Sequence, residues 1–117
     1  MTEEDMDEFE VALNGYAKHL CEDYRVWMRK SCSMERVSDE DLAKRYMVSF
    51  EQGNKYIRVV HGNGVQRSSH TFIVLNDDAK FKRGDILKSA SWASPAKNFA
   101  RGNILTGDWT NVQWTGA

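Results

Sequence analysis

Large apolar residues recur every three or four positions over the first quarter of this 117-residue chain. This spacing places them on one stripe of an α-helix. The sequence therefore predicts a long amphipathic helix over residues 1–30, whose stripe is buried against another element. Aromatic-rich stripes in small domains usually cover a sheet, and the alternative, pairing between two protomers, leaves a homodimer open. The stripe consists of Met6, Phe9, Leu13, Tyr16, Leu20, Tyr24 and Trp27.

Several segments after residue 45 are rich in β-branched and aromatic residues and are separated by turn residues. Gly53-Asn54 between the first two segments is typical of a β-hairpin. We therefore expect residues 45–90 to form a three- to four-stranded antiparallel meander, with the long helix across one face. This is an α+β fold, and the chain length fits a single domain spanning 1–117. The expected strands are 46–50, 56–60, 70–75 and 86–88.

Local signals predict three smaller elements. Capping-box spacing at Ser38 predicts a short helix over 38–45. Ser94-Pro95 places a capping residue before a proline that suits the first helical position, which predicts a short helix within 94–105. The final residues, 107–117, are expected to form an edge strand or a tail.

The charges of the chain are divided between its two parts. Residues 1–41 hold twelve acidic and five basic residues, whereas residues 42–117 hold five acidic and eleven basic residues. Either the acidic helix packs near the basic part and neutralises it, or each part presents a face to a different partner.

The segment 84–103 combines cations, an indole and small polar residues, and has no acidic residue after Asp85. Lys97 and Arg101 share one side of the helix expected there. Cations beside an exposed aromatic ring are suited to a phosphate or an unpaired base. The alternative is that Trp92 only pins the helix to the sheet and the cations are solvated. The candidate ligand-binding residues are Arg58, Arg67, Lys88, Trp92, Lys97, Arg101 and Asn103.

No residue pattern indicates a catalytic or metal centre. His19 and Cys21 are two positions apart on the expected helix and point in different directions, which disfavours a shared metal. Ser69 and His70 are adjacent in an expected strand and face opposite sides, so they do not form a nucleophile and its base. We therefore expect a protein that is not an enzyme, with no cofactor and no metal.

The second half of the chain contains the motifs Gln66-Arg67-Ser68, Gly84-Asp85-Ile86, Ala90-Ser91-Trp92, Pro95-Ala96-Lys97 and Ala100-Arg101-Gly102-Asn103-Ile104. These motifs resemble those of small uncharacterised proteins encoded by tailed bacteriophages. The resemblance covers about residues 55–105, and it departs from the family pattern where Asn98-Phe99 separates the lysine from the alanine-arginine step. It implies a phage protein acting inside an infected bacterium, but it implies no biochemical role.

Two further observations agree with a location in the host cytoplasm. The longest apolar run, 72–75, is far shorter than the ~20 residues of a membrane span. The first ten residues carry six carboxylates where a signal peptide would carry basic residues. We expect no membrane partner.

Two functions are compatible with these features. The first is non-covalent binding of nucleic acid or a nucleotide through the basic surface with Trp92. The alternative is inhibition of a host protein, such as a defence or transcription factor, through the acidic end of the long helix. The residues expected to contact such a partner are Glu3, Glu4, Asp7 and Glu8.

Overall fold

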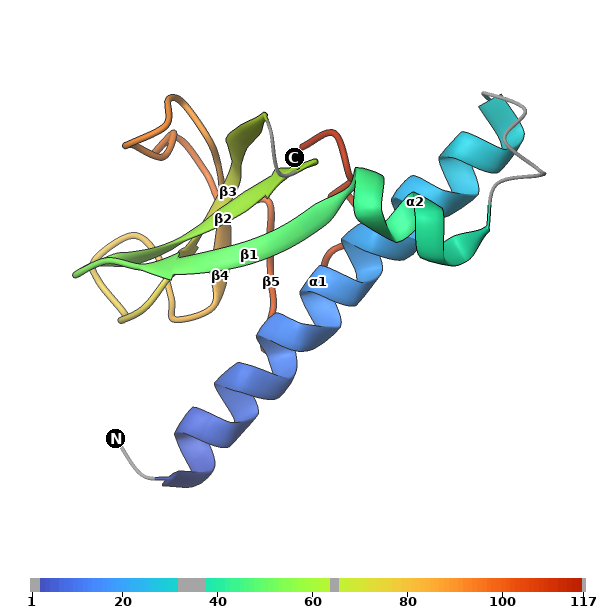
Figure 1. The fold of residues 1–117 in the computed structure, drawn as a ribbon. Coiled ribbons are helices and arrows are strands. Elements are labelled where there is room, and N and C mark those ends of the chain that lie inside the picture. The colour runs from blue at the N-terminus through green and yellow to red at the C-terminus, as the bar shows by residue number, and fades with distance from the viewer. Residues whose placement is uncertain (1–2, 32–37, 64–65, 117) are drawn as a thin grey trace.

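Residues Glu3–Ser31 form the long helix α1, which crosses one face of an antiparallel sheet in this computed structural model (Figure 1). The structure describes residues 3–31, 38–63 and 66–116, with all their side chains except those of residues 3–7, 31 and 39. The predicted α+β fold and its N-terminal helix are thus confirmed. No helix in this described part of the chain is long and apolar enough to span a membrane.

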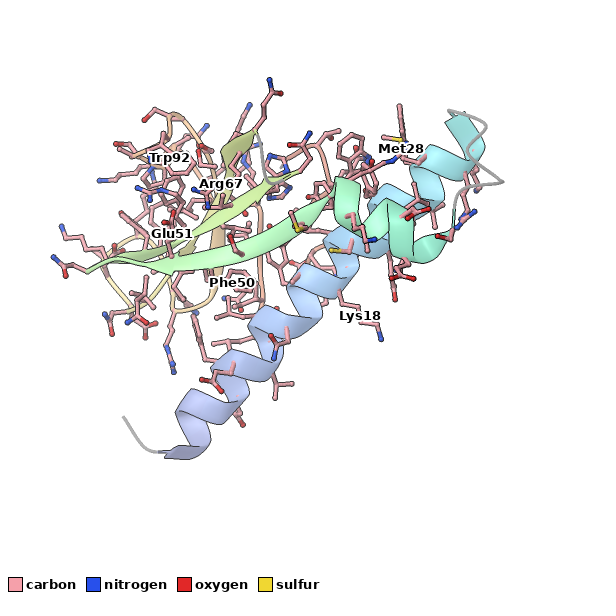
Figure 2. All side chains as sticks on the ribbon, viewed as in Figure 1. Lys18, Met28, Phe50, Glu51, Arg67 and Trp92 are labelled. Atoms are coloured by element: carbon pink, nitrogen blue, oxygen red, sulfur yellow. The ribbon has the colours of Figure 1, made fainter. Side chains whose placement is uncertain are left out.

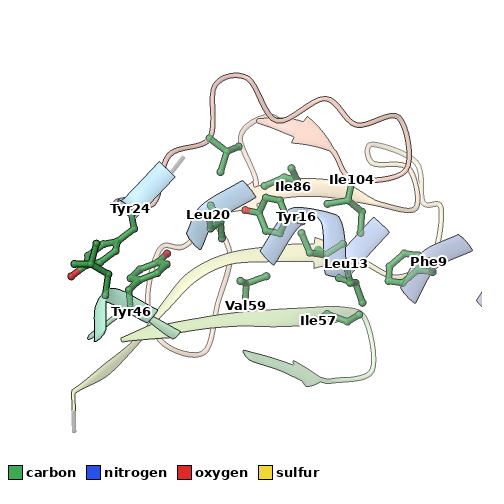
Figure 3. Packing of buried hydrophobic residues seen from close by; sticks show 13 residues of the cluster. Phe9, Leu13, Tyr16, Leu20, Tyr24, Tyr46, Ile57, Val59, Ile86 and Ile104 are labelled. Atoms are coloured by element: carbon green, nitrogen blue, oxygen red, sulfur yellow. The ribbon is translucent and has the colours of Figure 1, made fainter. Parts of the chain in front are cut away.

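The apolar stripe of α1 is buried against the sheet, as its spacing predicts. Tyr16 and Leu20 are fully buried, whereas Trp27 at the end of the stripe is 46% exposed. These buried side chains pack against Ile57 and Val59, which define the inner face of the sheet (Figure 3). Burial of side chains of this size stabilises the fold by about 2 kcal/mol each. The stripe from Phe9 to Tyr24 is therefore used within the chain, and the side chain of Met6 lies outside the described part.

The short helix α2, Asp39–Arg45, lies where the sequence predicts it. The Ser38 hydroxyl accepts a hydrogen bond from the backbone N–H of Asp41 at 3.2 Å. This bond satisfies one of the N–H groups that a helix start leaves without an intrahelical partner. Leu42 is fully buried in the same apolar cluster as the α1 stripe, so α2 closes one end of the core.

In the described part of the chain, the sheet has five strands in the order β1-β2-β3-β4-β5, whereas the sequence predicts three or four. The β1–β2 hairpin turns at Gly53, whose backbone N–H donates to the Tyr56 carbonyl at 2.8 Å. The fifth strand has only two residues, too few to leave a periodic pattern in the sequence. The strands are β1 (Met47–Gln52), β2 (Tyr56–Gly62), β3 (Arg67–Val74), β4 (Asp85–Lys88) and β5 (Gly102–Asn103).

The predicted short helix within 94–105 is wrong, because this segment contains no helix. Its backbone pairs with the end of β4 and the residue after it: the Ala96 N–H donates to the Lys88 carbonyl at 2.7 Å. Pro95 forms an isolated bridge with Ser89 instead of starting a helix. Hydrogen bonds to these neighbouring groups thus override the local helix signals.

Residues 107–116 form neither the expected edge strand nor a tail, and residue 117 lies outside the described part. They make turns that fold back over α1, with Val112 only 1% exposed. Nε2 of His19 donates to the Val112 carbonyl at 2.9 Å. The backbone N–H of Trp114 donates to the Asp23 carboxylate at 2.9 Å. The C-terminal segment is therefore part of the packed core.

The face of the sheet turned away from α1, called the outer face below, carries a second apolar cluster. Phe72 and Leu87 of the sheet pack there with Phe81, and Tyr56 lies at the margin of the cluster. The outer face is thus covered by irregular segments rather than by a helix. These segments carry three of the seven candidate ligand-binding residues, namely Trp92, Lys97 and Arg101.

Replacing Gly102 by alanine should lower the free energy of unfolding by about 1–3 kcal/mol. A Cβ atom at Gly102 would lie 2.1 Å from the backbone oxygen of Asp108, so the backbone must shift. Gly15→Ala is the matched control, because its Cβ would meet Trp109 at an ordinary 3.4 Å and alanine favours helix by about 1 kcal/mol. Urea unfolding of both variants checks the two signs, and a neutral Gly102→Ala would contradict the close packing of β5.

Candidate nucleic-acid interface

Tyr56, the first residue of β2, borders a cleft of about 550 Å³ on the outer face. We call it the lysine cleft, because Lys55, Lys80 and Lys97 line it together with the aromatic rings of Tyr56 and Phe81. The Lys97 ammonium lies 5.9 Å from the centroid of the Tyr56 ring, within the range of cation–π attraction. A volume of this size accommodates a small anionic ligand.

A tight turn at residues 76–81 fixes one wall of the lysine cleft. The Asp78 carboxylate accepts hydrogen bonds from the backbone N–H groups of Lys80 at 2.8 Å and Phe81 at 2.6 Å. These bonds, that from Phe81 above all, lower the pKa of the Asp78 carboxyl, and the nearby charges of Lys55 and Lys97 act in the same direction. The Lys80 ammonium also donates to the Lys97 carbonyl, which ties the two walls together.

A smaller hollow of about 240 Å³ adjoins the lysine cleft and shares Lys55 and Tyr56 with it. Arg58, two residues after Tyr56 on β2, lines this hollow and lies on the same face of the sheet. Its guanidinium stacks 4.6 Å from the centroid of the Trp92 ring, and its Nε donates to the Trp92 carbonyl at 2.8 Å. Arg58 also pairs with Glu51 at 3.1 Å.

Hydrogen bonds within the loop and to β3 hold the loop that contains Trp92. The hydroxyls of Ser69 and Ser89 lie 2.6 Å apart, and both are within 3.0 Å of the Ser91 carbonyl. The N–H of Ser91 donates to the Ser94 carbonyl at 3.1 Å. Trp92 is nevertheless 45% exposed, so a well-anchored loop presents a large aromatic ring to solvent (Figure 2).

The lysine cleft and the adjoining hollow with its arginine–tryptophan stack form one continuous surface, which we call the basic–aromatic face. It unites three of the predicted residues with four that sequence reasoning missed. Lys55 and Tyr56 carry a weak signal, because Tyr56 and Arg58 alternate onto one side of a predicted strand, whereas Lys80 and Phe81 carry none. The predicted members are Arg58, Trp92 and Lys97, and the added members are Lys55, Tyr56, Lys80 and Phe81.

The other four predicted residues lie elsewhere. Arg67 and Lys88 are exposed and line two different clefts, away from the lysine cleft. The Arg101 guanidinium lies 4.0 Å from the centroid of the Phe99 ring. Arg101 and Lys97 do not share one side of a helix, because the segment 94–105 contains no helix. The Asn103 side chain donates to the Arg83 carbonyl and to the Asp85 carboxylate and accepts from two backbone N–H groups, so it holds the β4–β5 region together.

The acidic residues of the alternative interface are only partly described. Glu8 is exposed on α1. The side chains of Glu3, Glu4 and Asp7 lie outside the described part, although the backbone of these residues is helical.

A buried polar network lies on the opposite side of the sheet. The shift in register between β2 and β3 turns both His70 and Thr71 towards α1. His70 Nε2 donates to the Gln113 carbonyl at 2.7 Å, so Nδ1 of the neutral ring accepts from Thr71 Oγ1 at 3.0 Å. Thr71 Oγ1 in turn accepts from the Tyr16 hydroxyl at 2.7 Å. Every member of the network has a partner, which indicates a structural role.

Metal-ligating side chains do not gather in the described part of the chain: no group of three or more His, Cys, Asp or Glu residues is placed to hold an ion. The two hollows of the basic–aromatic face are lined by four cationic side chains and three carboxylates, those of Glu51, Asp77 and Asp78. The arrangement of this face is suited to binding an anion beside an aromatic group.

The fold and this surface define a small α+β protein with a helix on one face of its sheet and a basic–aromatic face on the other. The whole chain, residues 1–117, matches the model of a family described as "Family of unknown function (DUF7717)", and the protein belongs to that family. No curated protein and no solved structure matches the chain.

Acidification should destabilise the fold through His70. Burial, opposed by the hydrogen bond to the Gln113 carbonyl, lowers the pKa of His70 from 6.5 to about 4. The unfolded chain therefore binds a proton that the folded chain excludes, so this contribution is complete above pH 6.5 and is lost as the pH falls towards 4. The loss amounts to about 3 kcal/mol.

Urea unfolding at about pH 7 and about pH 4.5 measures this loss, because the linkage acts between the two pKa values. His70→Gln is the comparison, since glutamine does not titrate and the carboxylates contribute equally to both proteins. The variant should lose about 2.5 kcal/mol less than the wild type between these two pH values. Equal losses in the two proteins would contradict a neutral, buried His70.

Proposed function

We propose that this protein is a small binding module without catalytic activity, which binds nucleic acid, or a nucleotide as its unit, through the basic–aromatic face. One observation carries the proposal: the lysine cleft shares Lys55 and Tyr56 with the hollow lined by Arg58, whose guanidinium stacks on the Trp92 ring. Lysines attract the phosphates of a nucleic acid, and exposed aromatic rings stack on its bases. The two kinds of contact thus lie side by side, as a chain of nucleotides requires.

The distribution of charge supports binding on the outer face in spite of a net charge of −1. The acidic first part of the chain forms α1, which covers the opposite face of the sheet (Figure 1). The segment that provides Trp92 and Lys97 contains no acidic residue between Asp85 and Asp108. A phosphate approaching the outer face is therefore separated from α1 by the sheet.

Binding without chemistry is supported by the places of the strongly shifted titratable groups. Burial lowers the pKa of His70 and raises the pKa values of Tyr16 and Tyr46 beyond the range of ordinary tyrosines. All three groups are buried on the side of the sheet that packs against α1, and none of them lines the lysine cleft. Catalytic groups with shifted pKa values are usually found in a cleft that substrate can enter. The lysine cleft lies on the other face of the sheet.

The resemblance to phage proteins supports a cellular setting for this module, namely the cytoplasm of an infected bacterium. The second candidate, inhibition of a host protein through the acidic end of α1, is favoured by the exposed side chains of Glu8 and Glu10. The two functions use opposite faces of the molecule. Substitutions on one face therefore test one function without disturbing the other.

Lys80→Gln and Lys97→Gln should each weaken binding of a fluorescent oligonucleotide about fivefold, because each removes about 1 kcal/mol of attraction to phosphate. Each should also reduce the slope of log affinity against log salt concentration by about 1. Fluorescence anisotropy over a series of salt concentrations measures both effects. Lys18→Gln is the matched control, since Lys18 is exposed on α1 and undergoes the same change of charge.

Equal effects of Lys18→Gln and Lys97→Gln would indicate attraction by overall charge and would contradict the site. An unchanged affinity in the cleft variants, together with capture of a host protein that is lost in a Glu8→Gln, Glu10→Gln double variant, would favour the second candidate.

Asp78→Asn should have the opposite sign and strengthen binding about threefold, because it removes a negative charge beside Lys55 and Lys97. The asparagine oxygen still accepts hydrogen bonds from the backbone of the 76–81 turn. The same anisotropy titration measures this gain. A weaker complex would show that Asp78 contacts the ligand directly and would contradict the assignment of the cleft to phosphate.

A further inference from the structure

Trp92 combines a fixed position with an unusually exposed ring. The loop is anchored through the Ser91 carbonyl, which is bound by two hydroxyls, and through the Trp92 carbonyl, which accepts from Arg58. Anchoring of the backbone on both sides of the ring means that the indole is presented to solvent in one place. Exposure of a tryptophan at 45% costs hydrophobic free energy that burial in the neighbouring apolar cluster would recover.

Arg58 covers part of this ring and leaves the rest open. Its guanidinium lies 4.6 Å from the ring centroid, so one face of the indole is occupied. A flat aromatic group can stack on the exposed part, where the arginine charge adds cation–π attraction. The nucleobase of an unpaired nucleotide has the required shape. In a duplex the faces of the bases are stacked on one another and are not accessible to Trp92.

The spacing of Tyr56 and Arg58 along β2 fits a phosphate and a neighbouring base of one nucleic-acid strand. The Lys97 ammonium lies over the Tyr56 ring, and the Arg58 guanidinium lies over the Trp92 ring. Tyr56 and Arg58 are two positions apart on the same face of β2. Two positions of a β-strand span about 7 Å. The phosphate site and the stacking site are therefore neighbours, joined through Lys55, which lines both hollows.

The charge of the face also disfavours a duplex. Its four cations lie close to three carboxylates, those of Glu51, Asp77 and Asp78. Tight duplex binders neutralise about 6–10 phosphates at fixed positions on a stiff helix. A flexible single strand can place one phosphate among the lysines and bend away from the carboxylates.

We propose that the basic–aromatic face binds single-stranded nucleic acid, with a phosphate among Lys55, Lys80 and Lys97 and an unpaired base stacked on Trp92. This inference rests on the proposed function and narrows it: it assigns most of the discrimination between single strand and duplex to Trp92. Lysine contacts contribute affinity for both forms, because both carry phosphates.

The test compares a labelled thymidine 12-mer with a 12-base-pair duplex by fluorescence anisotropy at the same salt concentration. The wild type should bind the single strand about tenfold more tightly. Trp92→Leu should weaken single-strand binding about tenfold and leave duplex binding unchanged, and Trp92→Phe should keep most of the affinity, because phenylalanine still stacks. The 12-mer should quench tryptophan fluorescence in the wild type, and this quenching should be smaller in Trp92→Phe.

Each contrary outcome has a separate meaning. Binding of strand and duplex with equal affinity, unaffected by Trp92→Leu, would overturn this inference and leave the proposed function standing. Competition by thymidine monophosphate as tight as that by the 12-mer would also overturn it, in favour of a nucleotide ligand. Binding of none of these probes would overturn both proposals. Thermal unfolding of Trp92→Leu at the wild-type temperature excludes loss of the fold as the cause of weak binding.

Discussion

Burial of the apolar stripe of α1 against the inner face of the sheet is the contact on which the rest of the structure depends. It fixes which face of each strand is inside, since Ile57 and Val59 meet the helix. The alternate positions of β2, Tyr56 and Arg58, must then point to the outer face. The same contact places the acidic helix behind the sheet. The position and the charge of the candidate interface therefore both follow from the packing of α1 on the inner face of the sheet.

The two sides of the sheet are closed by different means. On the inner side, the C-terminal segment is held by His19, Tyr46 and His70, which donate to the carbonyls of residues 112, 114 and 113. Buried polar networks of this kind tolerate little change, because each unpaired group costs about 1–3 kcal/mol. On the outer side, irregular segments cover the sheet only partly and leave hollows beside cations. Rigidity and binding surface are thus separated onto opposite faces.

Periodic features could be predicted from the sequence, whereas features created by long-range pairing could not. The amphipathic stripe, the hairpin at Gly53-Asn54 and the cap at Ser38 are local signals. The structure confirms the hairpin, the cap and the burial of the stripe from Phe9 to Tyr24. The helix expected after Pro95 fails because the segment pairs with the end of β4. For the site, the cationic and aromatic residues of the sequence predict Arg58, Trp92 and Lys97 as binding residues. These three residues lie apart along the chain. Lys80 joins them only through the turn at Asp78, and Asn103 turns out to stabilise the β4–β5 region.

The central claim is that the outer face, and not the acidic helix, contacts nucleic acid. Amide chemical shifts of the ¹⁵N-labelled protein, followed by NMR during titration with a single-stranded oligonucleotide, test it most directly. The account predicts shifts concentrated at residues 55–58, 76–81 and 89–97, with α1 unaffected. Shifts concentrated on α1, or small shifts spread evenly over the surface, would contradict it.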